Sequence, residues 1–127
     1  MKDNGDVAQD WLRKAESDFA AAELCLDRNT ALDTACFHCQ QAAEKSLKAW
    51  LIAHNEPFPF IHDLEQLIAL CTVRESRFNE LLDDGAALTP FAITLRYDLE
   101  FWPSIDDVRT ALEQARRVYR FVREHWS

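Results

Sequence analysis

Hydrophobic residues recur every three or four positions over most of the chain, and polar residues fill the positions between them. This period is that of an amphipathic α-helix with one apolar face. The pattern predicts long helices over residues 7–28, 32–54 and 104–126, and shorter helices over residues 62–71 and 75–85. Helices of this kind, joined by short connections, predict an all-α protein: an antiparallel up-and-down bundle of four main helices plus one or two short helices.

Several residues mark the expected helix ends. Ser104, followed by acidic residues in the next turn, is typical of a helix N-terminus. Pro57 and Pro59 end the second long helix, because proline cannot continue a helix. Gly85 is expected to close the helix that contains it, since glycine favours the left-handed conformation that follows many helices. Residues 86–103 lack a regular pattern and are expected to form a loop with one helical turn, and loops of this length are often functional.

The composition agrees with this fold class. The chain has 127 residues, of which 48% are hydrophobic, and it contains only 2 glycines and 4 prolines. So few helix breakers favour a helical protein over a sheet protein, which needs frequent turns. The length is that of one domain, so residues 1–127 are expected to form a single helical bundle.

Charge and hydropathy exclude some classes of partner. The formal net charge of -8 disfavours nonspecific binding to a phosphate backbone, and no DNA partner is expected. No apolar run reaches the roughly 18 residues needed to cross a bilayer, so no membrane partner is expected. The polar, acidic start MKDNGDVAQD is not typical of a signal peptide. A cytoplasmic location with reduced cysteines is therefore expected.

A C-x-x-C pair raises the question of a metal site. Cys36 and Cys39 lie three residues apart, which places them on one face of a helix. A structural zinc site needs four ligands, usually supplied as two such pairs, whereas Cys25 and Cys71 are isolated in the sequence. Cys36 and Cys39 also belong to the apolar stripe of their helix, where free cysteine acts as a small hydrophobic residue. The sequence therefore predicts core cysteines, with no metal and no cofactor.

Polar residues gather on the other face of the same helix. They are Gln40, Gln41, Glu44, Lys45 and Lys48, and their spacing permits weak pairs four residues apart. Spacing alone favours a solvated helix face for this group.

The same residues carry a resemblance to a known family. The stretch ACFHCQQAAEKSLKAWLI resembles the signature helix of HEPN domains, with its small-x-aromatic-x-x-Gln-Gln-Ala-x-Glu-Lys-x-Leu-Lys-Ala pattern. Four further stretches are similar to HEPN segments in the same order: WLRKAESDFAAAELCL, FIHDLEQLIALC, LRYD and SIDDVRTALEQARRVYRFV. The resemblance covers about residues 10–124, and Asp98 stands where the family commonly has proline.

The resemblance implies a four-to-five-helix bundle that is usually dimeric. Many prokaryotic members are encoded beside a minimal nucleotidyltransferase and form a toxin–antitoxin-like pair with it. Members are also associated with nucleotide or RNA binding, and some are metal-independent ribonucleases with an Arg-x4-6-His motif on the last helix. We therefore expect a protein that binds a nucleotide or RNA as the partner of a nucleotidyltransferase. A ribonuclease toxin and a non-catalytic dimeric interaction domain remain the alternatives.

The stretch RFVREH supplies a formal match to the ribonuclease motif, with Arg120 and His125 as candidate catalytic residues. A histidine can transfer protons near neutral pH, and an arginine can hold the scissile phosphate. However, cations near a helix C-terminus are also favoured by the helix dipole, and five residues of separation turn the two side chains about 140° apart. Ser127 stands where the better-defined toxic members carry a tyrosine.

Cationic and amide side chains are the candidate contacts to a nucleotide or RNA. They are Gln41, Lys45, Lys48, Arg96 and Arg116. Arg116 belongs to the locally basic stripe of the last helix. Arg96 precedes that helix, where it could contact a ligand or anchor the loop.

Overall fold

The computed structural model describes residues 2–127. Five α-helices follow one another along the chain: α1 (Asn4–Arg28), α2 (Leu32–Ala53), α3 (Leu64–Arg74), α4 (Leu82–Leu88) and α5 (Ile105–Glu124). Two 3₁₀ helices, η1 (Ser76–Leu81) and η2 (Thr89–Phe91), flank α4. No strand forms within the described residues, so the all-α prediction is confirmed.

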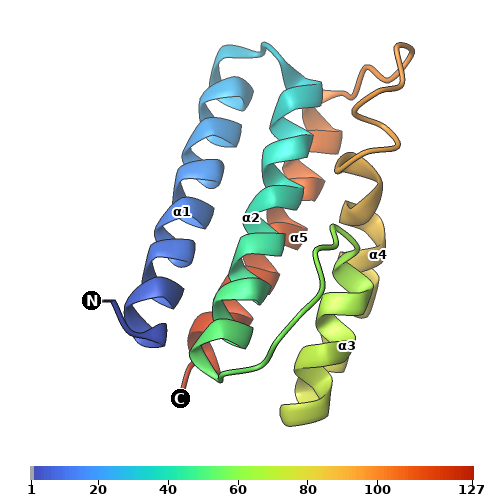
Figure 1. The fold of residues 1–127 in the computed structure, drawn as a ribbon. Helices are drawn as coiled ribbons and strands as arrows, with labels where there is room; N and C mark the ends of the chain where they lie inside the picture. The colour runs from blue at the N-terminus through green and yellow to red at the C-terminus, as the bar shows by residue number, and fades with distance from the viewer. Residues whose placement is uncertain (1) are drawn as a thin grey trace.

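The helices lie side by side in a bundle (Figure 1). The chain rises in α1 and descends in α2, so these two are antiparallel. The segment 54–63 then runs back along the bundle before α3 begins, and α5 descends in the same direction as α2. As a result the C-terminal ends of α2 and α5 meet, where the indole Nε1 of Trp50 donates a hydrogen bond to the carbonyl of His125 at 2.8 Å.

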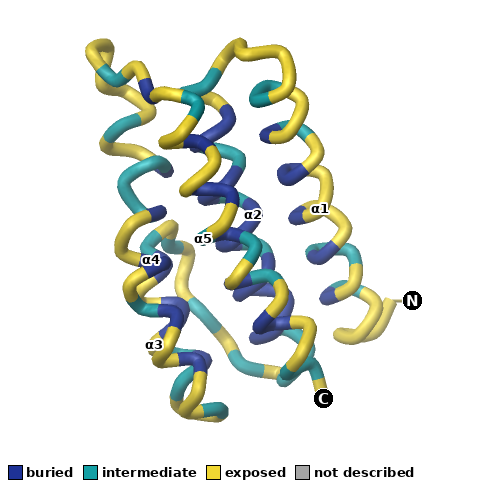
Figure 2. Tube along the Cα trace, turned by 180° about the vertical axis from the view of Figure 1, so that it is seen from behind, coloured by how far each residue is buried: buried dark blue, intermediate teal, exposed yellow. Residues whose placement is uncertain are grey.

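Helix α2 occupies the centre of the bundle and is buried on several sides (Figure 2). Both α1 and α2 carry solvent-inaccessible alanines at seven-residue spacing: Ala8, Ala15 and Ala22, and Ala35, Ala42 and Ala49. Small side chains repeated every two turns let two helices pack closely over their whole length. Within residues 2–127, no helix has the length and apolar character required to traverse a bilayer.

Capping explains most of the helix starts. Ser104 starts α5 as expected, and it forms a capping box with Asp107: the Asp107 N–H donates to Ser104 Oγ at 3.1 Å, and the Ser104 N–H donates to Asp107 Oδ2 at 2.9 Å. Asp63 caps α3, so that helix starts at Leu64, two residues later than predicted. The start of α2 differs, because Ala31 has a left-handed backbone (φ 49°) and supplies no side-chain cap.

The prediction that a helix ends at Gly85 was wrong. Helix α4 continues through Gly85 to Leu88. A Cβ atom at position 85 would lie 2.7 Å from Ile68 Cδ1 and 3.4 Å from Leu64 Cβ. The glycine therefore permits the close approach of α3 and α4, rather than supplying a left-handed helix end.

The interpretation of Cys36 and Cys39 as core residues is confirmed. Both side chains are inaccessible to solvent, as is Cys71. Burial raises the pKa of the Cys36 and Cys71 thiols to about 12 and also raises the pKa of Cys39. These thiols therefore stay protonated and behave as apolar packing groups.

Candidate functional site

The polar face of α2 is covered rather than solvated, so the sequence-based interpretation of this face was wrong. Gln40 is fully buried, and Glu44 and Lys48 are each only 4% exposed. Glu44 accepts from Lys48 Nζ at 3.0 Å and from Gln40 Nε2 at 3.1 Å, and its Oε1 lies 2.9 Å from His62 Nδ1. Gln41 donates to Gln40 at 2.7 Å, so this binding candidate also belongs to the network.

Aromatic rings close the network from outside. The Lys48 ammonium lies 5.9 Å from the ring centre of Trp11, 5.6 Å from that of Phe58 and 5.7 Å from that of Phe60. Such cation–π contacts stabilise a desolvated ammonium. Lys48 thus holds α1 and the segment 54–63 against α2, and a ligand could reach its ammonium only by displacing these rings.

The remaining binding candidates each contact a different group. Lys45 donates to Asp18 at 2.7 Å, and Arg116 pairs with Glu23. Arg96 lies over the Phe37 ring, 4.1 Å from its centre, and pairs with no carboxylate within residues 2–127. The five candidates therefore have separate partners, and their role in nucleotide binding stays a prediction.

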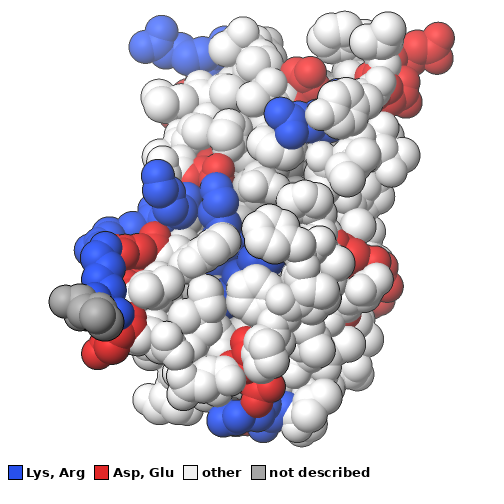
Figure 3. Space-filling view, in the orientation of Figure 1, with Lys and Arg blue, Asp and Glu red and all other residues white. Residues whose placement is uncertain are grey.

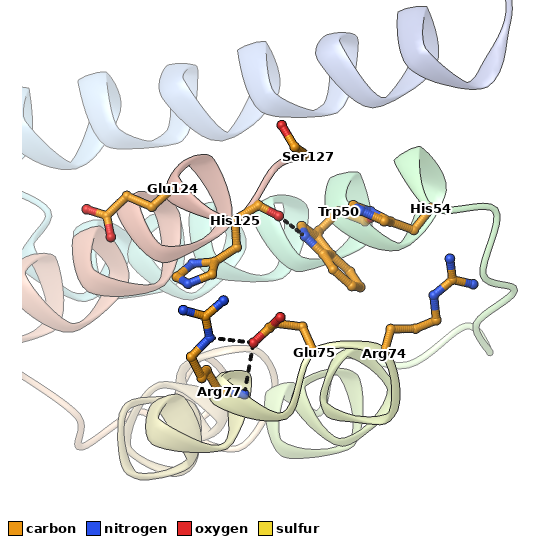
Figure 4. A pocket seen from close by; sticks show the side chains of 8 residues that line it. All are labelled: Trp50, His54, Arg74, Glu75, Arg77, Glu124, His125 and Ser127. Atoms are coloured by element: carbon orange, nitrogen blue, oxygen red, sulfur yellow. Dashed lines mark hydrogen bonds and ion pairs between the residues drawn. The ribbon is translucent and has the colours of Figure 1, made fainter.

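A different set of residues gathers where α2 and α5 end. A hollow of about 330 Å³, here called the histidine hollow, opens between these ends and the α3–η1 junction (Figure 4). Its lining residues are Trp50, His54, Arg74, Glu75, Arg77, Glu124, His125 and Ser127.

Both histidines of the hollow are fixed in the same way. Nδ1 of His54 lies 2.9 Å from the carbonyl of Trp50, and Nδ1 of His125 lies 2.9 Å from the carbonyl of Phe121. A carbonyl can only accept, so Nδ1 carries the proton and Nε2 holds the lone pair of each neutral ring. Each imidazole also stacks on an aromatic ring four residues earlier, with centres 3.9 Å apart.

Two arginines complete the hollow. Figure 4 shows His125 and Arg77 toward one end and His54 and Arg74 toward the other, with Glu75 between them. Arg77 Nε donates to Glu75 at 2.6 Å, and this hydrogen bond lowers the pKa of Glu75 and raises that of Arg77. The side chains of Arg77 and Arg74 are 65% and 46% exposed, so their carboxylate partners can be exchanged for another anion at small cost.

The two residues of the ribonuclease motif line different hollows. Arg120 lines a neighbouring hollow of about 320 Å³, which shares Glu124 with the histidine hollow. Within residues 2–127, no hydrogen bond or ion pair joins Arg120 to His125. This separation agrees with the turn of about 140° expected from their spacing on a helix.

The sequence did not single out His54, Arg74 and Arg77. They belong to the end of α2, the end of α3 and the start of η1, and nothing in their local pattern differs from an ordinary polar surface. Their meeting with His125 depends on the parallel course of α2 and α5.

With this fold and this hollow described, comparison with known families defines the class of protein. A sequence model of the HEPN domain matches residues 8–125. The chain therefore belongs to the HEPN domain family.

Two solved structures show the same fold. TT1696 from Thermus thermophilus is similar with a TM-score of 0.79 and 26% sequence identity, over 92% of this chain and 96% of that chain. ST0689, an archaeal HEPN homologue, is similar with a TM-score of 0.77 and 21% identity, over 100% of both chains. No curated protein sequence matches the chain at a significant level.

Proposed function

We propose that this HEPN protein binds RNA or a nucleotide through the histidine hollow, as the partner of a minimal nucleotidyltransferase in a toxin–antitoxin-like system. The observation that carries the binding proposal is the gathering of two fixed imidazoles and two exposed arginines in one hollow. The whole chain acts as one HEPN domain in the cytoplasm.

The chemistry of the hollow suits a phosphate group. Guanidinium groups bind phosphate oxygens in pairs, and an imidazole offers either a donor or an acceptor at Nε2. The negative net charge repels most nucleic acid, so the ligand must enter a local site rather than spread over the surface. Glu75 and Glu124 add acceptors for ribose hydroxyls or base amino groups.

The binding test uses a short single-stranded RNA with a fluorescent label and measures anisotropy at several salt concentrations. Arg77→Gln is expected to weaken binding about tenfold, since a charge-assisted hydrogen bond contributes about 1.5–3 kcal/mol. Loss of one phosphate contact should also lower the slope of log affinity against log salt by about 0.7.

Arg109→Gln is the matched control for this test. Arg109 is an exposed arginine of α5 that pairs with Asp106, one turn away. The substitution removes the same charge at a distance from the hollow, and affinity should stay within about twofold of the unchanged protein. Equal weakening by Arg77→Gln and Arg109→Gln would refute the proposed site.

The second candidate function is metal-independent RNA cleavage. The lone pair of His125 Nε2 and the guanidinium of Arg77 in the same hollow favour it, because cleavage needs a proton acceptor beside a held phosphate. Arg120 would join such a site only from a second copy of the chain. An RNA that is bound but stays intact in the presence of a chelator would indicate binding, whereas a cleaved RNA would indicate metal-independent cleavage.

Assembly as a homodimer is the third part of the proposal. Figure 3 shows that white, uncharged groups cover much of the face seen in Figure 1, with separate charged groups among them. Phe60, in the segment 54–63, and Ile93, Leu99 and Trp102, in the segment 92–103, are each more than half exposed. Exposed apolar groups of this size favour association. Light scattering should give about twice the chain mass of 14.7 kDa.

Co-expression with a nucleotidyltransferase encoded nearby should show whether that protein joins the complex. If RNA and nucleotides both fail to bind, the protein is a non-catalytic dimeric interaction domain.

A further inference from the structure

The segment 56–60 has the sequence Glu-Pro-Phe-Pro-Phe and is here called the proline rod. Pro57 and Pro59 have fixed φ angles, and each also restricts the residue before it to extended conformations. The segment forms neither helix nor strand. An extended proline-rich chain rises about 3.1 Å per residue, so the rod spans roughly 12 Å. Because its backbone is stiff, a turn at one end of the rod moves the other end instead of being absorbed within it.

The first residue of the rod is tied to the histidine hollow. Glu56 accepts from Arg74 Nη1 at 2.5 Å, and Arg74 lines that hollow beside His54 (Figure 4). The Arg74 and Glu56 side chains are 46% and 33% exposed, so their ion pair is weak and an anion in the hollow can replace Glu56. The Glu56 N–H also donates to the Leu51 carbonyl at 2.8 Å, at the end of α2. The rod therefore turns about this point, and the pairing with Arg74 fixes its direction.

The other end of the rod carries the rings that cover Lys48. The ring centres of Phe58 and Phe60 lie 5.6 Å and 5.7 Å from the Lys48 ammonium, and Trp11 of α1 completes the group, here called the Lys48 cage. Phe60 is fully exposed, so nothing within residues 2–127 holds its ring in place from outside. The rod can therefore leave Lys48 without breaking a packed core around Phe60.

The chain just beyond the rod is held more firmly. Gln40 Nε2 donates to the carbonyl of His62 at 3.0 Å, and Nδ1 of His62 lies 2.9 Å from Oε1 of Glu44. Gln40 and Glu44 are both buried, so these contacts cost more to break than the half-exposed pair of Glu56 and Arg74. Movement is therefore expected in the rod itself, while His62 stays on α2.

We propose that the proline rod couples the histidine hollow to the Lys48 cage, so that an anion which takes Arg74 from Glu56 lets the rod turn away from Lys48. In the closed state the anion meets an arginine that Glu56 already neutralises, whereas in the open state it meets an unpaired one. This difference in affinity is what shifts the equilibrium between the two states. The identity of the anion as RNA or a nucleotide rests on the proposed function, whereas the coupling of Arg74 to Lys48 does not.

The first experiment needs no ligand. The full chain is labelled with an amine-reactive ester, and mass spectrometry of its peptides gives the labelling rate of each lysine. Arg74→Gln imitates the loss of Arg74 to a ligand and should raise the Lys48 rate about two- to fivefold, as expected for a half-exposed ion pair. Glu56→Gln should raise the rate by the same factor, and the double variant should show no further increase. Lys14, which is exposed on α1, provides the internal reference. An unchanged Lys48 rate in both variants would overturn the coupling.

Glu65→Gln is the matched control. Glu65 is an exposed carboxylate in the first turn of α3 and has no ion pair within residues 2–127. The substitution removes the same charge as Glu56→Gln without touching the rod, so the Lys48 rate should not change. An equal rise in Glu65→Gln and Glu56→Gln would show a general effect of charge and would count against the proposed coupling.

The second experiment adds the labelled RNA of the binding test. RNA should raise the Lys48 labelling rate about two- to fivefold. Because coupling between sites is reciprocal, Phe60→Ala should tighten RNA binding by up to about the same factor, although it changes neither a charge nor a residue of the hollow. RNA that fails to bind would refute the site in the hollow, while the effect of Arg74→Gln on Lys48 would still establish the coupling. RNA that binds without changing the Lys48 rate, and with the same affinity in Phe60→Ala, would overturn the coupling and leave the binding site in place.

Discussion

The ammonium of Lys48 lies 3.0 Å from the carboxylate of Glu44, and the two side chains are only 6% and 5% exposed. An ion pair in this position is desolvated, so each charge depends on its partner and on the groups around it. Gln40 and His62 satisfy the other carboxylate oxygen, and aromatic rings face the ammonium. This cluster connects α2 to the segment that returns along the bundle, and it is therefore a structural element of the fold.

The first prediction concerns this pair. Glu44→Ala should lower the free energy of unfolding by about 3–5 kcal/mol, because it leaves the Lys48 charge buried without a partner. Adding Lys48→Met to Glu44→Ala should recover part of that loss, since the uncompensated charge is gone. Urea denaturation measures both. Glu113→Ala is the control: it removes an exposed carboxylate from α5 and should change stability by no more than about 0.5 kcal/mol.

The buried thiols give a prediction for alkaline pH. Burial raises the pKa of Cys36 and Cys71 from 9.0 to about 12, so the folded state keeps protons that the unfolded state releases. The free energy of unfolding should therefore fall as the pH rises from 9 to 12, by about 1.4 kcal/mol per pH unit for each such thiol. Urea midpoints across this range measure the slope.

Substitution identifies the thiols responsible. Cys71→Ala should make the alkaline slope shallower by about 1.4 kcal/mol per pH unit, whatever its effect at neutral pH. Cys25 is only partly buried, so Cys25→Ser serves as the control and should leave the slope close to that of the unchanged chain. An unchanged slope in Cys71→Ala would contradict the burial argument. Thiol reagents should correspondingly modify Cys25 first in the native protein.

The third prediction concerns the contact of α3 with α4. Gly85→Ala should gain about 1 kcal/mol of helix propensity but place a Cβ 2.7 Å from Ile68 Cδ1, inside a packed core. Overpacking costs about 1–3 kcal/mol, so the net effect should be destabilising. Ile68→Val removes the Cδ1 atom, and in that background Gly85→Ala should become neutral or stabilising. Thermal denaturation of the four variants of this cycle tests the change of sign, and a destabilisation of equal size in both backgrounds would contradict it.

Local patterns predicted the helices well because each long helix carries its own period, and α5 also carries its own N-cap. The N-cap at Ser104 is entirely local, and the structure has it as predicted. Gly85 was wrongly assigned to a helix end because glycine is common both at helix ends and where two helices approach closely. Only the position of Ile68 distinguishes the two cases here.

The polar face of α2 and the histidine hollow were beyond local reasoning for a similar reason. Spacing shows that Glu44 and Lys48 share a face, but the cover over that face comes from α1 and from the segment 54–63. Likewise His54 and His125 are far apart in the sequence, and they share a hollow only because α2 and α5 run in parallel. Positions of this kind depend on topology rather than on the sequence around them.

The last prediction separates a binding protein from a ribonuclease. RNA incubated with the purified protein and a chelator should stay intact, because Arg120 and His125 line different hollows in one chain. Expression should then cause no growth arrest that depends on His125, and Arg77→Gln should affect affinity alone. Gel analysis of a labelled RNA provides the measurement. Cleavage that persists with chelator and falls about 100- to 10,000-fold in His125→Ala would instead establish His125 as a general acid or base. In that case Arg120→Ala should also be inactive if Arg120 takes part, and a mixture of His125→Ala and Arg120→Ala chains should regain activity if the two residues meet across a dimer. An Arg120→Ala chain that cleaves RNA as well as the unchanged chain would show that Arg120 has no role.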